Sequence, residues 1–132
     1  MGQPAAKQGD QIVATDTHIV LVPSPSGSVP TPLPHPFSGI LDGGLSSDVK
    51  IEKKAAATVD STATNTPPHV PTPPGVSFAN PPKNQGKIIM GSATVKINGK
   101  TAARNGDTAK TCNDPSDMPV GTVVAAGTVL IG

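Results

Sequence analysis

One short motif recurs three times in this 132-residue chain, and it constrains the fold more than any other feature. The clearest copy is segment 95–103, Val-Lys-Ile-Asn-Gly-Lys-Thr-Ala-Ala, and segment 49–57, Val-Lys-Ile-Glu-Lys-Lys-Ala-Ala-Ala, aligns with it without a gap. Valine and isoleucine alternate with lysine as in a half-buried strand, and Asn98-Gly99 tolerates the positive φ of a tight turn. Each copy therefore predicts a short strand, a turn and a return.

The third copy is split between the two ends of the chain. The last four residues and the first residues after Met1 read Val-Leu-Ile-Gly-Gly-Gln-Pro-Ala-Ala when they are placed end to end, which matches the other copies position by position. Such a repeat predicts three similar units around one axis, with the termini close together. The units fall around residues 1–18 completed by 120–132, 46–69 and 91–112, within one domain of residues 1–132.

Composition favours an all-β fold with long loops. The chain has 16 prolines and 14 glycines but only two phenylalanines and no tryptophan or tyrosine. Proline and glycine clusters between short strands are typical of all-β domains. We expect the proline-rich segments 23–36 and 67–82 to be stiff extended loops rather than sheet strands, because proline lacks a backbone N–H. A core so poor in large side chains predicts a further stabilising element, such as a bound metal.

Charge and cysteine content exclude several classes of protein. The formal net charge is +1, and no basic segment is interleaved with aromatic residues, so we expect no nucleic-acid binding. A single cysteine cannot form a disulfide within the chain. The first residues lack the apolar core of a signal peptide, so we expect the protein to be made and first folded in the cytoplasm.

Four side chains carry a nitrogen or sulfur atom that binds zinc strongly: His18, His35, His69 and Cys112. His18 and His69 each follow the central alanine of their repeat by 13 residues, and Cys112 follows Ala102 by ten. Three arms of the repeat therefore deliver one ligand each toward the common axis. His35, which lies between two prolines, supplies the fourth.

The alternative for each of these residues is ordinary. A loop histidine is usually solvated, and a lone buried cysteine usually packs as a small apolar residue. Equivalent placement on three arms favours a metal, and thiolate with imidazole favours zinc, although copper and nickel bind the same ligand types. Four protein ligands close a tetrahedral site, so we expect one structural zinc ion per chain, no catalytic residues and no enzymatic activity.

The repeats also carry a family resemblance. Segments 4–7, 55–58 and 101–104 read Pro-Ala-Ala-Lys, Ala-Ala-Ala-Thr and Thr-Ala-Ala-Arg, degenerate copies of Pro-Ala-Ala-Arg in a matching context. The chain resembles the PAAR-repeat proteins, the spike-tip proteins of contractile injection systems such as the type VI secretion system and phage-tail-like particles. The resemblance implies a small β-strand cone with zinc near its vertex, bound by three histidines and one cysteine. It also implies docking of one monomer on a trimeric β-helical spike protein.

The function expected from the resemblance is mechanical. The cone caps and sharpens the spike, passes transiently through a target membrane, and leaves the cytoplasm with the spike; noncovalent effector cargo is compatible with this role. Two alternatives stay open. A zinc-dependent hydrolytic enzyme predicts an open ligand position, and a binding module predicts that the proline loops recruit partners.

Overall fold

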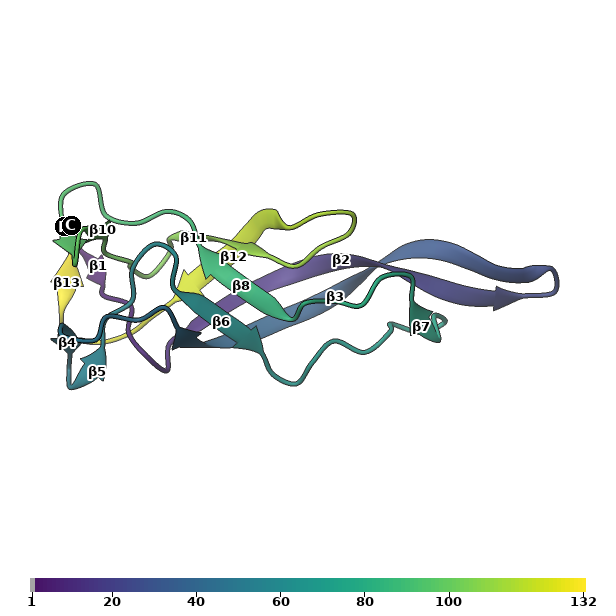
Figure 1. Cartoon of the computed structure of the whole chain (residues 1–132), viewed down its shortest axis with the longest axis horizontal. Helices are drawn as coiled ribbons and strands as arrows, with labels where there is room; N and C mark the ends of the chain where they lie inside the picture. Colours follow the sequence, from purple (N-terminus) through teal and green to yellow (C-terminus); the bar gives the residue numbers. More distant parts are fainter. Residues whose placement is uncertain (1) are drawn as a thin grey trace.

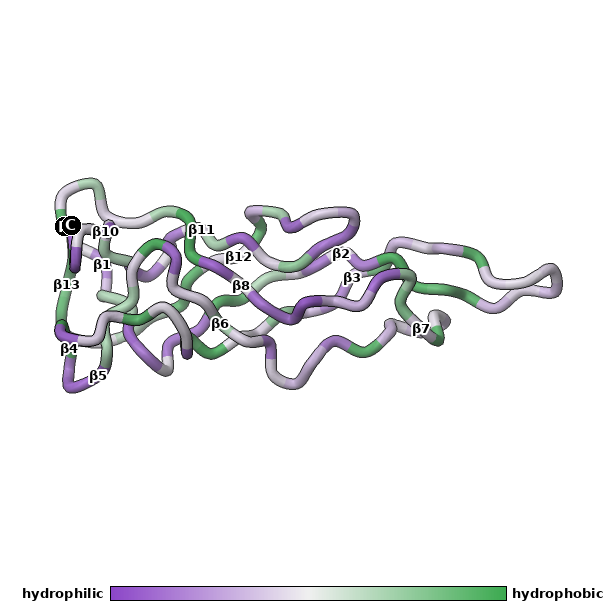
Figure 2. The backbone as a smooth tube through the Cα atoms, in the orientation of Figure 1, coloured by the Kyte–Doolittle hydropathy of each residue, from purple (hydrophilic) through white to green (hydrophobic). Residues whose placement is uncertain are grey.

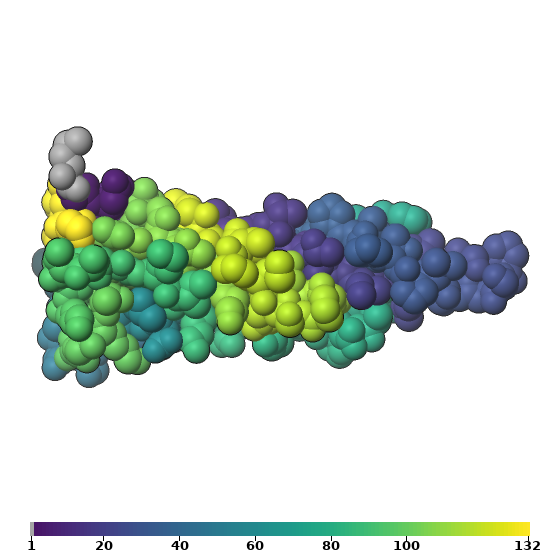
Figure 3. Space-filling view, turned by 90° about the horizontal axis from the view of Figure 1, so that it is seen from above, coloured from purple at the N-terminus to yellow at the C-terminus, as the bar shows by residue number. Residues whose placement is uncertain are grey.

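A computed structural model describes residues 2–132, and every regular element in this range is a β-strand. The molecule tapers from a broad end, which holds both termini, to a narrow end formed by one long hairpin (Figures 1 and 3). No helix within the described range is long and apolar enough to cross a membrane. The strands are β1 (Gln3–Pro4), β2 (Gln11–Ser24), β3 (Gly27–Gly43), β4 (Lys50–Ile51), β5 (Lys54–Ala55), β6 (Thr62–Asn65), β7 (Ser77–Phe78), β8 (Gln85–Ile88), β9 (Lys96–Ile97), β10 (Lys100–Thr101), β11 (Thr108–Thr111), β12 (Met118–Val124) and β13 (Leu130–Ile131).

The broad end consists of three two-stranded units, as the repeat predicts. They are β4 with β5, β9 with β10, and β1 with β13, and in the last pair Gln3 lies opposite Ile131. The pairing of the first strand with the last confirms that the termini lie close together (Figure 1). Isolated bridges join the units to one another: Ala5 with Arg104, Lys7 with Ala56, and Thr58 with Ala102.

Each arm leaves the broad end through the same turn. The backbone N–H of Lys7 donates to the Asp10 carboxylate at 3.0 Å, and Arg104 donates to Asp107 in the same way at 2.7 Å. In the second arm Ser61 replaces the aspartate and accepts from Thr58, also at 3.0 Å. A short polar side chain that accepts a hydrogen bond from a nearby backbone N–H is the usual way to stabilise such a turn. The repeat therefore conserves a turn geometry through different residues.

The middle of the molecule is a closed antiparallel sheet. Its strand order is β12-β11-β8-β6-β3-β2, and β12 also pairs with β2, so the six strands form a ring. Closure leaves no unpaired edge along this part. The interior is filled by side chains from all six strands: Ile12, Phe37, Leu41, Ala63, Ile88, Ala109 and Val123. This core is thin, as the composition predicts.

The narrow end is the β2–β3 hairpin, which contains 14 consecutive residue pairs from Gln11–Ile40 to Ser24–Gly27. The expectation that segment 23–36 avoids the sheet is therefore wrong. Four prolines lie at alternate positions of β3: Pro30, Pro32, Pro34 and Pro36. On a strand, alternate N–H groups point to the same edge, and the neighbouring Ser38 directs its N–H away from β2, to Asn65. The prolines thus remove donors from the outer edge of β3 and none from its pairing with β2.

Candidate metal centre

Strand β2 carries two of the candidate ligands on one face. Side chains alternate along a strand, and Asp16, His18 and Val20 all point into the molecule, with exposed fractions of 0, 1 and 0%. His35 lies directly opposite Asp16 on β3 and is also buried. The hairpin therefore brings a carboxylate and two imidazoles to one level, just beyond the closed sheet.

The other two candidates come from segments far away in the sequence. His69 lies in the proline-rich segment between β6 and β7, and its backbone N–H donates to the Asn84 side chain at 2.7 Å. Cys112 follows β11 directly and is 2% exposed. Next to it, Asn113 accepts the N–H of Thr17 at 2.6 Å, which ties this segment to β2. Two anchored segments thus close over the hairpin from different sides.

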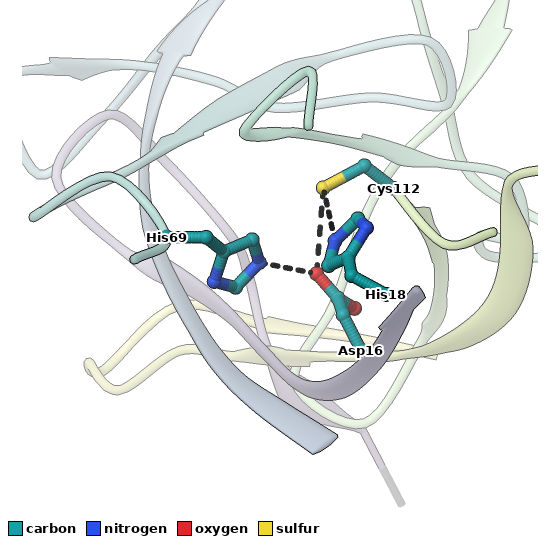
Figure 4. A group of neighbouring side chains, drawn as sticks. All are labelled: Asp16, His18, His69 and Cys112. Atoms are coloured by element: carbon teal, nitrogen blue, oxygen red, sulfur yellow. Dashed lines mark hydrogen bonds and ion pairs between the residues drawn. The ribbon is translucent and has the colours of Figure 1, made fainter. Parts of the chain in front are cut away.

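Four of these side chains converge (Figure 4). One ligand atom each from Asp16, His18, His69 and Cys112 lies within 4.8 Å of the others. Asp16 Oδ2 lies 2.9 Å from His69 Nε2 and 3.4 Å from Cys112 Sγ, and Cys112 Sγ lies 3.6 Å from His18 Nε2. In a tetrahedral zinc site, bond lengths of about 2.0–2.3 Å place neighbouring ligand atoms roughly 3.3–3.8 Å apart. The three separations in the cluster, 2.9, 3.4 and 3.6 Å, are close to this range.

Burial sets the protonation of the cluster when no metal is bound. It lowers the pKa of His18 below the ordinary value, and the nearby His69 lowers it further. Burial also lowers the pKa of His35. Burial raises the pKa of the Cys112 thiol to about 11, and the Asp16 carboxylate adds to this effect. Burial therefore favours the neutral imidazoles of His18 and His35, and a cation beside Cys112 is needed to favour its thiolate.

The residues fit a bound metal ion. His18 Nδ1 is the one buried side-chain nitrogen or oxygen of the described residues without a hydrogen-bond partner, and Asp114 Oδ2 lies 3.6 Å from it. Ligating histidines commonly direct the second ring nitrogen at a carboxylate, which orients the ring. Carboxylate, imidazole and thiolate groups all bind zinc, and the cluster contains at least one side chain of each kind. The cluster could bind a metal ion, and its chemistry is consistent with zinc.

The structure brings together three of the four predicted ligands, His18, His69 and Cys112. The ring centroid of His35 lies 5.4 Å from that of His18 and 5.6 Å from that of His69, so the fourth predicted ligand lies directly beside the cluster. The sequence reasoning did not include Asp16, because it considered only nitrogen and sulfur ligands. The position of Asp16 could have indicated its place in the cluster. It precedes His18 by two residues and therefore lies on the same face of the strand.

A polar groove of about 670 Å³ reaches the cluster from one side. Its lining includes His18 and Cys112 at the inner end, and the Lys83–Asp117 ion pair, 2.7 Å long, lies at its rim. His18 and Cys112 are nevertheless almost fully buried. A buried, closely spaced donor set is typical of a structural metal site rather than a catalytic one, which keeps a position open.

Comparison with known proteins agrees with the repeat. A family model described as the PAAR motif matches residues 22–115, which is most of the chain. No curated protein matched the sequence. The matched range contains two complete copies of the motif, and the structure supplies the third, split copy through the pairing of β1 with β13. The chain belongs to the PAAR-motif family.

Proposed function

We propose that this protein is the metal-stabilised tip of a contractile injection system, which caps a trimeric β-helical spike and sharpens it for passage through a target envelope. The family assignment suggests a spike-tip protein. The observation that carries the proposal is the geometry of the broad end, where three similar units surround one axis. Assembly would take place in the cytoplasm, and the tip would leave with the spike.

The broad end presents three strand edges without partners. In the described residues, β4, β9 and β13 each pair with one strand only, namely β5, β10 and β1. An unpaired edge offers backbone N–H and C=O groups to an added strand. A trimeric β-helix that ends in three equivalent strands offers three such edges, so one monomer matches one trimer.

The axis at this end is apolar. Ile51, Ile97 and Ile131 occupy equivalent positions of the three repeats, are each 7–8% exposed, and pack with Ala5, Ala56 and Ala102. These three isoleucines are almost fully buried, and the small surface that they keep at the centre gives a docking partner a small apolar contact. The arrangement favours a threefold partner over a random surface contact.

The narrow end has the opposite chemistry from the polar turns of the broad end. Segments 17–41 and 61–82, which include the outer part of the hairpin and much of the chain beside it, contain no Asp, Glu, Lys or Arg. Figure 2 shows the outer end of the hairpin without strongly hydrophilic stretches. A charged side chain costs about 3 kcal/mol or more at the centre of a bilayer. An uncharged point therefore meets less resistance in hydrocarbon than a charged one.

At the narrow end, one outer strand edge has partners and the other lacks N–H donors at its prolines. Along the outer edge of β2, the carbonyls of Leu21 and Ile19 accept from Val76 and Ala79, and the N–H of Ile19 donates to Asp114. The outer edge of β3 lacks N–H donors at its four prolines. Unpaired donors are costly in lipid, so this construction suits passage of the narrow end through a membrane.

The test is docking to a purified trimeric β-helical spike protein, followed by native mass spectrometry. We expect one chain per trimer. Ile97→Lys should weaken the complex at least 100-fold with unchanged metal content, whereas Lys110→Ala, an exposed change on β11, should not. Because Ile97 also packs in the apolar cluster, Leu130→Asp provides a second variant at an exposed position of the same end. A wild-type chain that does not bind the trimer would contradict the proposal.

A further inference from the structure

We infer that a groove beside the outer edge of β3 binds an aromatic side chain that carries an N–H or O–H donor, a tryptophan or tyrosine of a partner protein. The groove lies between β3 and segment 66–73 and has a volume of about 360 Å³. This segment runs along the hairpin and not at the broad end (Figure 1). The inference therefore goes beyond the proposed function and does not rest on docking of the broad end.

One backbone carbonyl at this edge of β3 has no donor. The carbonyl oxygen of Ser38 accepts the N–H of Thr66 at 3.1 Å, and that of Pro34 accepts the hydroxyl of Thr72 at 2.8 Å. Pro36 lies between them at the next alternate position, so its carbonyl points to the same edge, and no group within residues 2–132 donates to it there. A ligand with a donor can take the place that water has at such a group.

The segment opposite this carbonyl does not supply the donor. Three of the five residues between Thr66 and Thr72 are prolines, which have no N–H. His69 directs its N–H to the Asn84 side chain at 2.7 Å, which leaves only Val70, and the side chain of Val70 is 73% exposed. The segment is therefore fastened to β3 at both ends and leaves the groove open between them.

The walls of the groove are apolar and stiff. No Asp, Glu, Lys or Arg lines it, so a charged ligand finds no partner there. Proline fixes its own φ, and the hydrogen bonds of Thr66 and Thr72 hold both ends of the segment, so little conformational freedom is lost on binding. The apolar lining comes from Pro36, Pro67, Pro68, Val70, Pro71 and Pro73.

These features fit a single aromatic side chain with a donor. Domains that recognise proline-rich peptides bind the prolines with aromatic side chains, and here the prolines form the receiving surface. Tryptophan and tyrosine combine a large apolar ring with one polar hydrogen, which needs an acceptor when the ring is buried. These 132 residues contain neither, so a second copy of them does not provide the ring. The volume is near the lower limit of about 300–1,000 Å³ for ligand pockets, which suits one side chain.

The experiment titrates the isotope-labelled full chain with N-acetyl-tryptophanamide, which represents a tryptophan of a partner, and follows the backbone amides by NMR. We expect saturable shifts of Thr66, Val70 and Thr72 around the groove. The analogue with a methylated indole nitrogen keeps the ring but loses the N–H. It should bind at least tenfold more weakly, because the ring then covers the Pro36 carbonyl without donating to it.

Val70→Asp and Val76→Asp form a matched pair of variants. Both valines are exposed, at 73% and 66%, and lie in the same proline-rich stretch, but only Val70 lines the groove. We expect Val70→Asp to weaken binding of N-acetyl-tryptophanamide at least tenfold and Val76→Asp to weaken it less than twofold. Both variants should keep the Tm of the wild type, because surface substitutions change stability little.

Three results would overturn the inference: no saturable shifts, equal binding of the methylated analogue or of N-acetyl-leucinamide, and equal losses in the two valine variants. Self-association of the chain that shifts the same amides would assign the groove to a second copy and overturn it as well. Docking to the spike trimer is measured separately, and Val70→Asp should leave it unchanged. Failure of one proposal is thereby distinguishable from failure of the other.

Discussion

The backbone N–H of Ala6 donates to the carbonyl oxygen of Ala103 at 2.9 Å, although the two residues are 97 positions apart in the sequence (103 − 6). Ala103 in turn donates to Ala57 at 3.1 Å, and Ala57 donates to Ala6 at 3.0 Å. The three bonds form a closed cycle around the axis. All three alanines are fully buried, so the methyl groups meet where no larger side chain has space.

Enlarging one of these alanines should open the cycle. We expect Ala57→Val to lower the free energy of unfolding by about 1–3 kcal/mol, because two added methyl carbons overpack a closed site. Urea denaturation measures the change. Ala93→Val, at an exposed position of the third repeat, is the control and should stay within about 0.5 kcal/mol of wild type. Equal effects of the two variants would mean that the cycle is not tightly packed.

Removal of the metal should destabilise the narrow end and then the whole chain. With free zinc at about a thousand times the dissociation constant, binding adds roughly 4 kcal/mol to the stability of the folded state. Chelation or Cys112→Ser should remove this contribution and lower the Tm, as measured by calorimetry. The exposed change Ser47→Ala should leave the zinc-dependent shift intact. An identical Tm with and without chelator would contradict a structural metal.

The metal-free protein should be most stable near neutral pH. Because burial lowers the pKa of His18 and His35 in the folded state, the unfolded chain binds more protons in acid, and stability should fall as the pH drops below about 6.5. Because burial raises the pKa of Cys112 from 9.0 to about 11, stability should also fall as the pH rises through that range.

Urea denaturation in the presence of a chelator, at about pH 5, 7.5 and 10.5, measures both arms of this profile. Cys112→Ser should abolish the alkaline decrease that the thiol causes and keep the acid one. A stability that stays constant from pH 7.5 to 5 would show that the histidines are not buried in the neutral form.

The prolines of β3 should protect the hairpin from aggregation. Pro32→Val returns a backbone N–H to the exposed edge, so we expect faster aggregation on heating, measured by light scattering, with little change in the folded state. Thr31→Val is the matched control, because Thr31 pairs with Val20 and its N–H faces β2. Aggregation rates that do not differ between the two variants would show that edge donors are unimportant here.

The sequence was sufficient for the parts of the fold that repeat. The gapless match of segments 49–57 and 95–103, with the split third copy, predicted the three units and the adjacent termini. The sequence was insufficient for β3. Proline was expected to be excluded from every position of a strand, although it removes a hydrogen bond only on the edge to which its missing N–H would point. His18, His69 and Cys112 were found by their spacing from the repeated alanines. The place of Asp16 in the cluster depends on Thr111 and Asn113, which reach it only in three dimensions.

The repeats at the broad end are similar but not identical, since the position between the conserved valine and isoleucine is Lys50, Lys96 or Leu130. A partner with true threefold symmetry cannot distinguish the three ways of seating such a cap, so all three give the same complex. Threefold degeneracy favours capture by about 0.65 kcal/mol, which is RT ln 3. In the proposed complex of one chain with a trimer, one subunit of the partner would face Leu130 and the other two would face Lys50 and Lys96. In that complex a single small chain would give three identical polypeptides different surroundings, and a particle built on rotational symmetry would acquire one marked side.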